Sequence, residues 1–274
     1  MTQKILSIYS PTQKKDRLFL EISREHIACW TLHHNTEEVG SMELFQIEPE
    51  KPFEESFLSV MQNSGLLPQY NADAHVQVIW DNEFAEILPK DYFHSCTDNI
   101  IQMMMPYQPY DTQIQHYDTS NFSVLYQVDQ VIADTLQKHF PDYRAIHKYG
   151  AIGKVLMNSV SSSNFVLHLL CFHRHSILTG VQNGQLLFIK RIKFLLPLDV
   201  VYHIVNAADQ YGQDLEQVTV VLSGMLESDS SLFDAIYKYI PNIEIDSVTK
   251  NLFDAEKFNE YPEHYFVPFF KYAI

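Results

Sequence analysis

Residues 164–224, NFVLHLLCFHRHSILTGVQNGQLLFIKRIKFLLPLDVVYHIVNAADQYGQDLEQVTVVLSG, contain the pattern that decides the fold. Their first half holds three apolar, strand-like runs. The last two flank Asn183-Gly184, a dipeptide typical of tight hairpins because both residues tolerate a positive φ. After Pro197, apolar residues recur at helical spacing, and 218–222 is a short β-branched run. This order predicts three antiparallel strands, a helix and a buried strand.

The same order of elements recurs in the first half of the chain, beginning near Arg17. Its members are strand-like runs at 18–22, 27–32 and 41–47, a helix at 53–61 and a buried strand at 76–80. Both copies then continue with an amphipathic helix, a proline and a strand, at 131–146 and 232–245. The sequence therefore predicts an α/β fold with mixed sheets in two related halves.

The two predicted halves are residues 1–160 and 161–274. We place the boundary at 158–164, NSVSSSN, because this is the one cluster of small polar residues between two periodic regions. Residues 81–128 of the first half have no counterpart in the second and are interpreted as an insertion.

A repeated unit of this kind resembles the actin, hexokinase and Hsp70 superfamily, in which two ribonuclease H-like halves face each other across a cleft. More closely, the chain resembles a family of uncharacterised bacterial proteins, of the Bacteroidetes type, with a degenerate actin-like ATPase fold. It is distantly similar to the pilus-assembly M and type II secretion L proteins, which implies a role as an assembly platform. The segments that carry the family resemblance are 87–93 (ILPKDYF), 187–188 with 198–202, and 220–224 (VVLSG).

Composition limits the partners and the compartment. The net charge of −15 disfavours a sequence-independent grip on nucleic acid. Cys29, Cys96 and Cys171 are odd in number and unpatterned, which favours reduced thiols in the cytoplasm. The N-terminus lacks the apolar run of a signal peptide, and the most apolar window, 194–205, is shorter than the ~20 residues of a spanning helix. We therefore expect a cytoplasmic chain without membrane insertion.

Two aromatic segments are candidate interfaces. Met103–Met105 with Tyr107, Tyr110 and Tyr117 in the insertion would make an adaptable surface for a protein partner, although the same segment could pack on its own domain. The C-terminal residues 261–274 are equally aromatic, and we expect them to be docked on the protein because a free tail of this composition would aggregate. A homodimer is a further alternative.

Cys171, His173 and His175 share one face of an extended strand, and such side chains could bind zinc. Three ligands within five residues are crowded, however, and no fourth ligand is evident. The preferred interpretation is a buried cysteine beside solvent-facing histidines in a hairpin turn, with no metal.

The resemblance directs attention to the first hairpin of each half. In catalytic actin-like ATPases this turn carries an aspartate, a glycine and a small hydroxyl residue, because glycine lets backbone N–H groups close on phosphates while the carboxylate holds the metal. Here the turns are 23–26, SREH, and 172–175, FHRH. Of the glycine pair that binds the purine in that superfamily, only Gly224 after Ser223 remains. We therefore expect no catalytic residues, no cofactor and no useful binding of ATP.

The leading hypothesis is a non-catalytic scaffold that binds another protein. The alternative is a nucleotide-binding or phosphotransfer protein with a divergent Mg-ATP site in the cleft, using Asp81, Ser223 and Gly224, with Arg24 and Arg174 as phosphate clamps at echoing positions. A metal-dependent enzyme built on the cysteine and histidines is the remotest of the three.

Overall fold

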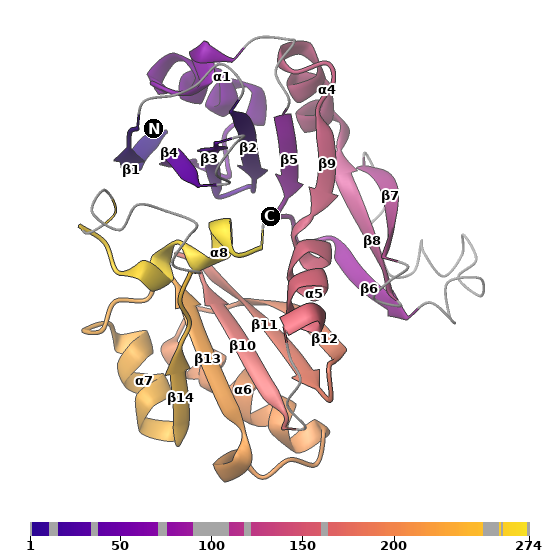
Figure 1. The fold of residues 1–274 in the computed structure, drawn as a ribbon, viewed down its shortest axis with the longest axis vertical. Helices are drawn as coiled ribbons and strands as arrows, with labels where there is room; N and C mark the ends of the chain where they lie inside the picture. Colours follow the sequence, from indigo (N-terminus) through magenta and orange to yellow (C-terminus); the bar gives the residue numbers. More distant parts are fainter. Residues whose placement is uncertain are drawn as a thin grey trace. The chain divides into compact units, whose positions relative to one another are not determined.

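The computed structural model describes residues 2–10, 16–33, 38–70, 76–89, 110–117, 122–159, 164–248, 258 and 260–272. The chain forms two compact units (Figure 1). Unit 1 comprises Met1–Ala151 with Lys250–Phe258 and Ala273, and unit 2 comprises Ile152–Thr249 with Asn259–Tyr272 and Ile274. Both units contain helices and a mixed sheet, which confirms the predicted fold class.

Unit 1 is built on a six-stranded sheet in the order β1-β4-β3-β2-β5-β9. Strands β2, β5 and β9 run parallel to one another, and the remaining neighbours are antiparallel. The strands are β1 (Gln3–Ile8), β2 (Arg17–Ile22), β3 (His26–Leu32), β4 (Val39–Gln46), β5 (Val76–Trp80) and β9 (Arg144–His147). Helices α1 (Phe53–Asn63) and α4 (Gln130–His139) pack against each other, and a short helix, η1 (Leu67–Gln69), follows α1.

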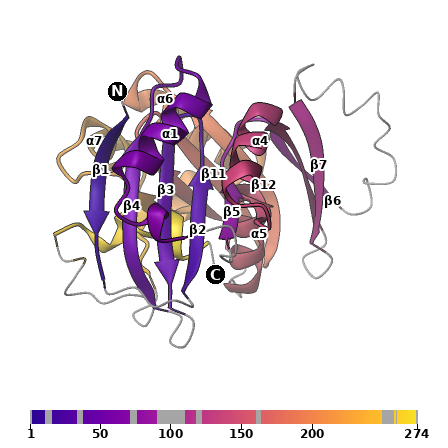
Figure 2. The ribbon, with the colours of Figure 1, turned by 90° about the horizontal axis from the view of Figure 1, so that it is seen from above.

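A second, three-stranded sheet of unit 1 lies in the stretch interpreted as an insertion. Its order is β6-β8-β7, formed by β6 (Ala85–Pro89), β7 (Tyr110–Tyr117) and β8 (Phe122–Asp129), and Figure 2 shows it beside the main sheet. Tyr117 stacks on Phe122 and contacts Gly150 so closely that a Cβ there would lie 1.9 Å from the tyrosine oxygen. This part of the insertion therefore packs on its own unit. The proposed docking residues 103–107 fall outside the described residues.

Unit 2 contains a five-stranded sheet in the order β12-β11-β10-β13-β14. The strands are β10 (Val166–Cys171), β11 (His175–Gln182), β12 (Gln185–Lys193), β13 (Thr219–Gly224) and β14 (Asn242–Ile245). Its helices are α5 (Lys148–Ser159), which begins in unit 1, then α6 (Pro197–Gln210), η3 (Leu215–Gln217), α7 (Ser231–Tyr239), η4 (Glu263–Tyr265) and α8 (Val267–Phe270). One face of the sheet forms a core with α6 and α7. Positive φ angles of 53° at Asn183 and 70° at Gly184 confirm the predicted hairpin turn.

The two main sheets repeat one strand order. The order β4-β3-β2-β5-β9 in unit 1 matches β12-β11-β10-β13-β14 in unit 2, with two antiparallel pairings followed by two parallel ones. This repetition supports a duplication, as the sequence pattern predicted. The residues predicted for the two cores are buried: Phe19, Val76, Val78, Leu167, Leu169, Val220 and Leu222.

The two ends of the chain also take part in the fold. β1 was not predicted, although it contains Ile5, Leu6 and Ile8, and it pairs with β4 at the sheet edge. The C-terminal aromatic segment is docked on the protein, as expected: Tyr265, Phe266 and Phe269 are buried, and Phe269 packs edge-on against Phe172.

None of the helices in the described ranges has the length and apolar character needed to cross a bilayer.

Candidate functional site

The first hairpin of unit 1 and the end of β5 bring three chemically active side chains together. Glu21 lies near the end of β2, His26 begins β3, and Asp81 directly follows β5. The backbone N–H of Asp81 donates to the carbonyl of Ile22 at 2.9 Å, so the chain stays beside β2 for one residue beyond the strand. The carboxyl ends of parallel strands are the edge at which open α/β sheets place their ligands.

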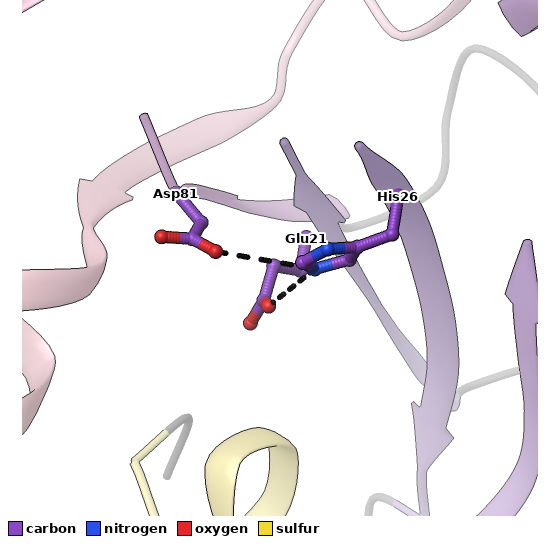
Figure 3. A group of neighbouring side chains, drawn as sticks. All are labelled: Glu21, His26 and Asp81. Atoms are coloured by element: carbon purple, nitrogen blue, oxygen red, sulfur yellow. Dashed lines mark hydrogen bonds and ion pairs between the residues drawn. The ribbon is translucent and has the colours of Figure 1, made fainter. Parts of the chain in front are cut away.

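The three side chains form a tight, buried group (Figure 3). The Nε2 atom of His26 lies 3.0 Å from Oε1 of Glu21 and 4.0 Å from Oδ2 of Asp81. One ligand-type atom from each residue falls within 4.8 Å of the others, which is a spacing that could hold a metal ion. Asp81 was a predicted site residue. Glu21 was not, although an acid inside the apolar run LFLEI is a signal that could have identified it.

Lys148 completes this group from the first turn of α5. Its ammonium donates to Oε2 of Glu21, and both side chains are almost fully buried. One oxygen of Glu21 therefore contacts His26 and the other contacts Lys148. Buried charges are tolerated when they are paired and hydrogen-bonded, so the chain itself supplies a cation to its own carboxylates. We call Glu21, His26, Asp81 and Lys148 the ionic cluster.

The ionic cluster does not fit the magnesium ion that an actin-like ATPase fold implies. Magnesium in phosphate sites keeps several water ligands and contacts one or two accessible carboxylates. Here Glu21 is fully buried and held by Lys148. A divalent ion at this position would have to displace a buried ammonium group.

The hairpin turns do not fit a phosphate group either. Each is closed by one backbone hydrogen bond, from Ser23 to His26 at 3.0 Å and from Phe172 to His175 at 2.9 Å. Without glycine, these short turns lack the backbone freedom by which N–H groups converge on an anion.

The closing hydrogen bonds align residues 23–26 with residues 172–175, as the sequence paired these two turns. Matching the closing hydrogen bonds places Arg24 opposite His173 and Arg174 opposite Glu25. The two arginines therefore stand one position apart in the matched turns and not at the same position. The equivalent residues are His26 and His175. Arg24 instead lies 3.6 Å from Asp129, the N-cap of α4.

Arg24 lines a pocket of about 350 Å³ in unit 1. The pocket lies at the N-terminal ends of α1 and α4 and also contains Lys51, Glu48 and Asp129. Each cation has an acidic partner, since Lys51 is 2.9 Å from Glu48 and Arg24 is close to Asp129. The opposite charges reduce the attraction of this pocket for a phosphate.

Ser223 and Gly224 end strand β13 in unit 2, and Gly224 has a structural explanation. Its φ is +90°, and a Cβ at this position would lie 2.1 Å from the carbonyl oxygen of Cys171. The backbone of Met225 donates to that same oxygen at 2.8 Å. Glycine is therefore required by the close approach of β13 to β10, and Ser223 is buried beside it.

The cysteine and histidines at the first hairpin of unit 2 do not form a metal site. Burial raises the pKa of Cys171 to about 12, although Ser176 lowers it slightly, so the sulfur is a neutral thiol. His173 is exposed, whereas His175 is buried and stacks on Phe172 with ring centres 4.7 Å apart. The expectation of solvent-facing histidines is thus wrong for His175. Among the described residues, only Glu21, His26 and Asp81 have metal-ligand spacing.

Comparison with solved structures shows which known proteins share this fold. A Bacteroides thetaiotaomicron protein with an actin-like ATPase fold and unknown function superposes with a TM-score of 0.74 at 12% identity, covering 91% of this chain and 97% of that one. The PilM–PilN type IV pilus biogenesis complex contains a chain that superposes with a TM-score of 0.58 at 12% identity, covering 94% and 96%. No protein with a curated description matches the sequence.

The sequence itself matches one family model. The match extends over residues 6–243 and thus includes both main sheets except the first residues of β1 and the last residues of β14. The chain therefore belongs to DUF3822, a protein family of unknown function.

Proposed function

We propose that this chain is a protein-interaction module built on an actin-like fold, without ATP hydrolysis. The observation that carries the proposal is the ionic cluster, in which Lys148 contacts the carboxylate of Glu21 at the edge where a metal and phosphates would bind. Because Lys148 pairs with one of the two carboxylates, the site has less electrostatic attraction left for a metal–nucleotide complex. The glycine-free hairpin turns support the same conclusion.

The similarity to PilM supports the interaction part of the proposal. That structure was solved as a PilM–PilN complex. A chain with a similar fold therefore forms part of a protein complex there. A retained fold in which a lysine occupies the ligand edge is consistent with selection for the protein's surface and not for catalysis. The partner here is a protein, and its binding should survive removal of nucleotide.

The proposal is tested by thermal unfolding with millimolar Mg-ATP. A ligand at 100 times its Kd stabilises the native state by about 2.7 kcal/mol, which would raise the Tm of a protein of this size by roughly 5 to 10 °C. We expect a shift of less than about 1 °C, equal to that with magnesium chloride alone. A nucleotide-binding actin-like protein is the positive control.

The contrary result is a shift of several degrees that disappears in Arg24→Ala. That outcome would favour the second candidate function, a divergent nucleotide site, for which the specific observation is the pocket lined by Arg24 and Lys51. A shift that persists in Arg24→Ala but vanishes in Asp81→Asn would instead place the nucleotide at the ionic cluster.

A further inference from the structure

Residues 260–272, called here the docked segment, are anchored at the ends of two parallel strands of unit 2. The ammonium of Lys271 donates to both carboxylate oxygens of Asp246 at 2.8 Å, and Asp246 directly follows β14. Nε2 of His264 donates to the carbonyl oxygen of Leu226 at 3.1 Å, two residues beyond the end of β13. Because β13 and β14 run parallel, both anchors lie at the carboxyl ends of their strands.

Aromatic contacts extend this cover to the neighbouring strand. The ring of Phe269 packs edge-on against that of Phe172, the residue after β10, with ring centres 6.4 Å apart. Helices η4 and α8 of the docked segment both contact β13, which is parallel to β10. The docked segment therefore spans the edge at which open α/β sheets place their ligands. Ser223 and Gly224, the candidate nucleotide residues of unit 2, end β13 at this same edge.

The docked segment is folded by its own backbone and is held to unit 2 by side chains. The backbone–backbone hydrogen bonds described for it close within it, such as those from Phe266 to Glu263 and from Lys271 to Val267, both 3.2 Å long. It adds no strand to the described five-stranded sheet. Its departure would leave the strand ladders intact, so it can open as a separate cooperative unit.

The docked segment has the chemistry of a peptide bound in a groove. Phe266, Val267 and Phe269 are each at most 2% exposed, and large buried side chains of this kind are the anchors of peptide interfaces. The ion pair is less shielded, since 23% of the Lys271 side chain and 11% of the Asp246 side chain are exposed. The apolar anchors thus fix the segment, and the pairing of one cation with Asp246 sets its position along the edge.

We propose that the docked segment is an autoinhibitory ligand of unit 2. It closes the ligand edge, opens as a unit, and is displaced by a partner segment that carries aromatic residues and a cation matching Lys271. This inference rests on the proposed function as an interaction module, and it adds which edge the partner takes and what its chemistry is.

The first measurement is amide hydrogen exchange on the full chain. In Lys271→Glu the amides of Phe269 and Phe270 should exchange about tenfold faster or more, while those of β10 and β13 keep their wild-type rates. Adding Asp246→Lys to that variant reverses both charges and should restore the protection. Lys238→Glu, which alters an exposed lysine on α7, is the matched control and should change neither set of amides.

The second measurement uses a fluorescently labelled synthetic peptide of residues 258–274. The docked segment competes with this peptide, so the apparent affinity rises with the fraction of chains in which the edge is open. We expect Lys271→Glu to bind the peptide about tenfold more tightly than the wild type does, measured by fluorescence anisotropy. The same substitution placed in the peptide should abolish this gain, because the peptide then brings no cation to Asp246.

Two outcomes would overturn the inference. Equal acceleration of exchange in the docked segment and in β13 would show that the segment opens only when unit 2 unfolds. Failure of Lys271→Glu to bind the peptide would show that the opened edge accepts no segment. Neither measurement involves nucleotide, whereas the proposed function fails by a Tm shift with Mg-ATP, so the two failures are distinguishable.

Discussion

Lys148 sets the electrostatics of the ionic cluster. Glu21 and Asp81 are buried carboxylates, and the Lys148 ammonium is the only group of fixed positive charge among the four residues of the cluster. Removing one partner of a buried ion pair leaves an uncompensated charge, which typically costs about 3 to 5 kcal/mol. Stability and metal affinity at this site should therefore depend on the same side chain.

We predict that Lys148→Met lowers stability by about 3 kcal/mol and that millimolar Mn²⁺ restores part of the loss. The restored part should appear because Glu21, His26 and Asp81 then have ligand spacing without a competing ammonium. Urea unfolding with and without the metal measures both effects. Lys138→Met, which removes an exposed ion pair of 3.7 Å with Glu54, is the control and should change neither. If Lys148→Met retains wild-type stability, the ionic cluster is not a stabilising charge pair.

His168 gives a pH dependence whose sign can be worked out. Burial lowers its pKa from 6.5 to about 4, while Asp246 raises it and Lys271 lowers it further. As the pH falls, the unfolded chain takes up the proton near 6.5, before the folded chain does. The histidine therefore reduces stability progressively from pH 6.5 down to about 4, and the full loss is about 3 kcal/mol.

We expect His168→Leu to remove this part of the acid sensitivity. The difference in free energy of unfolding between variant and wild type should grow in favour of the variant between pH 7 and pH 4.5, as measured by urea denaturation. His173→Leu alters an exposed histidine of the adjacent hairpin and should leave the pH profile unchanged. Parallel profiles for His168→Leu and the wild type would show that His168 titrates normally in the folded protein.

At the level of elements, β1 depends on one buried acid of the neighbouring strand. Glu43 in β4 accepts hydrogen bonds from Lys4 Nζ at 2.6 Å, from the backbone of Gly65 at 2.9 Å, and from the hydroxyl groups of Tyr9 and Ser64. Burial alone would raise the pKa of Glu43, but these hydrogen bonds together lower it. The polar side chains of Lys4 and Tyr9 thus attach this strand to the sheet.

Glu43→Leu should therefore release β1 before the rest of unit 1 unfolds. We expect amide hydrogen exchange at Leu6 and Ile8 to accelerate by about tenfold or more, since local opening loses its main restraint. Glu54→Gln, on the exposed side of α1, is the control. The wild type should show the same release as the pH falls below the unfolded pKa of a glutamate, near 4.5, and toward the lower pKa of the folded state. Unchanged exchange at Leu6 in Glu43→Leu would show that backbone pairing with β4 alone holds the strand.

At the level of the whole molecule, one strand order occurs twice with different chemistry at equivalent edges. The edge of unit 1 carries Glu21, His26 and Asp81, whereas the matching positions of unit 2 are Leu170, His175 and Met225. Only the histidine is common to both. The two units thus share backbone architecture, and the charged residues of the ionic cluster belong to one of them.

Properties that depend on local interactions could be predicted from the sequence. The Asn183-Gly184 hairpin follows from which residues tolerate a positive φ. The succession of strands and helices along each half follows from apolar periodicity. The burial of Phe269 and its neighbours follows from the cost of exposing a large aromatic surface.

The ionic cluster required the tertiary structure. Lys148 lies 127 residues from Glu21 in the sequence, and no periodic pattern links them. Their contact exists because β9 returns parallel to β5 and delivers the first turn of α5 to the end of β2. Long-range pairing and register arise from the packing of whole elements, which the spacing of residues within one segment does not specify.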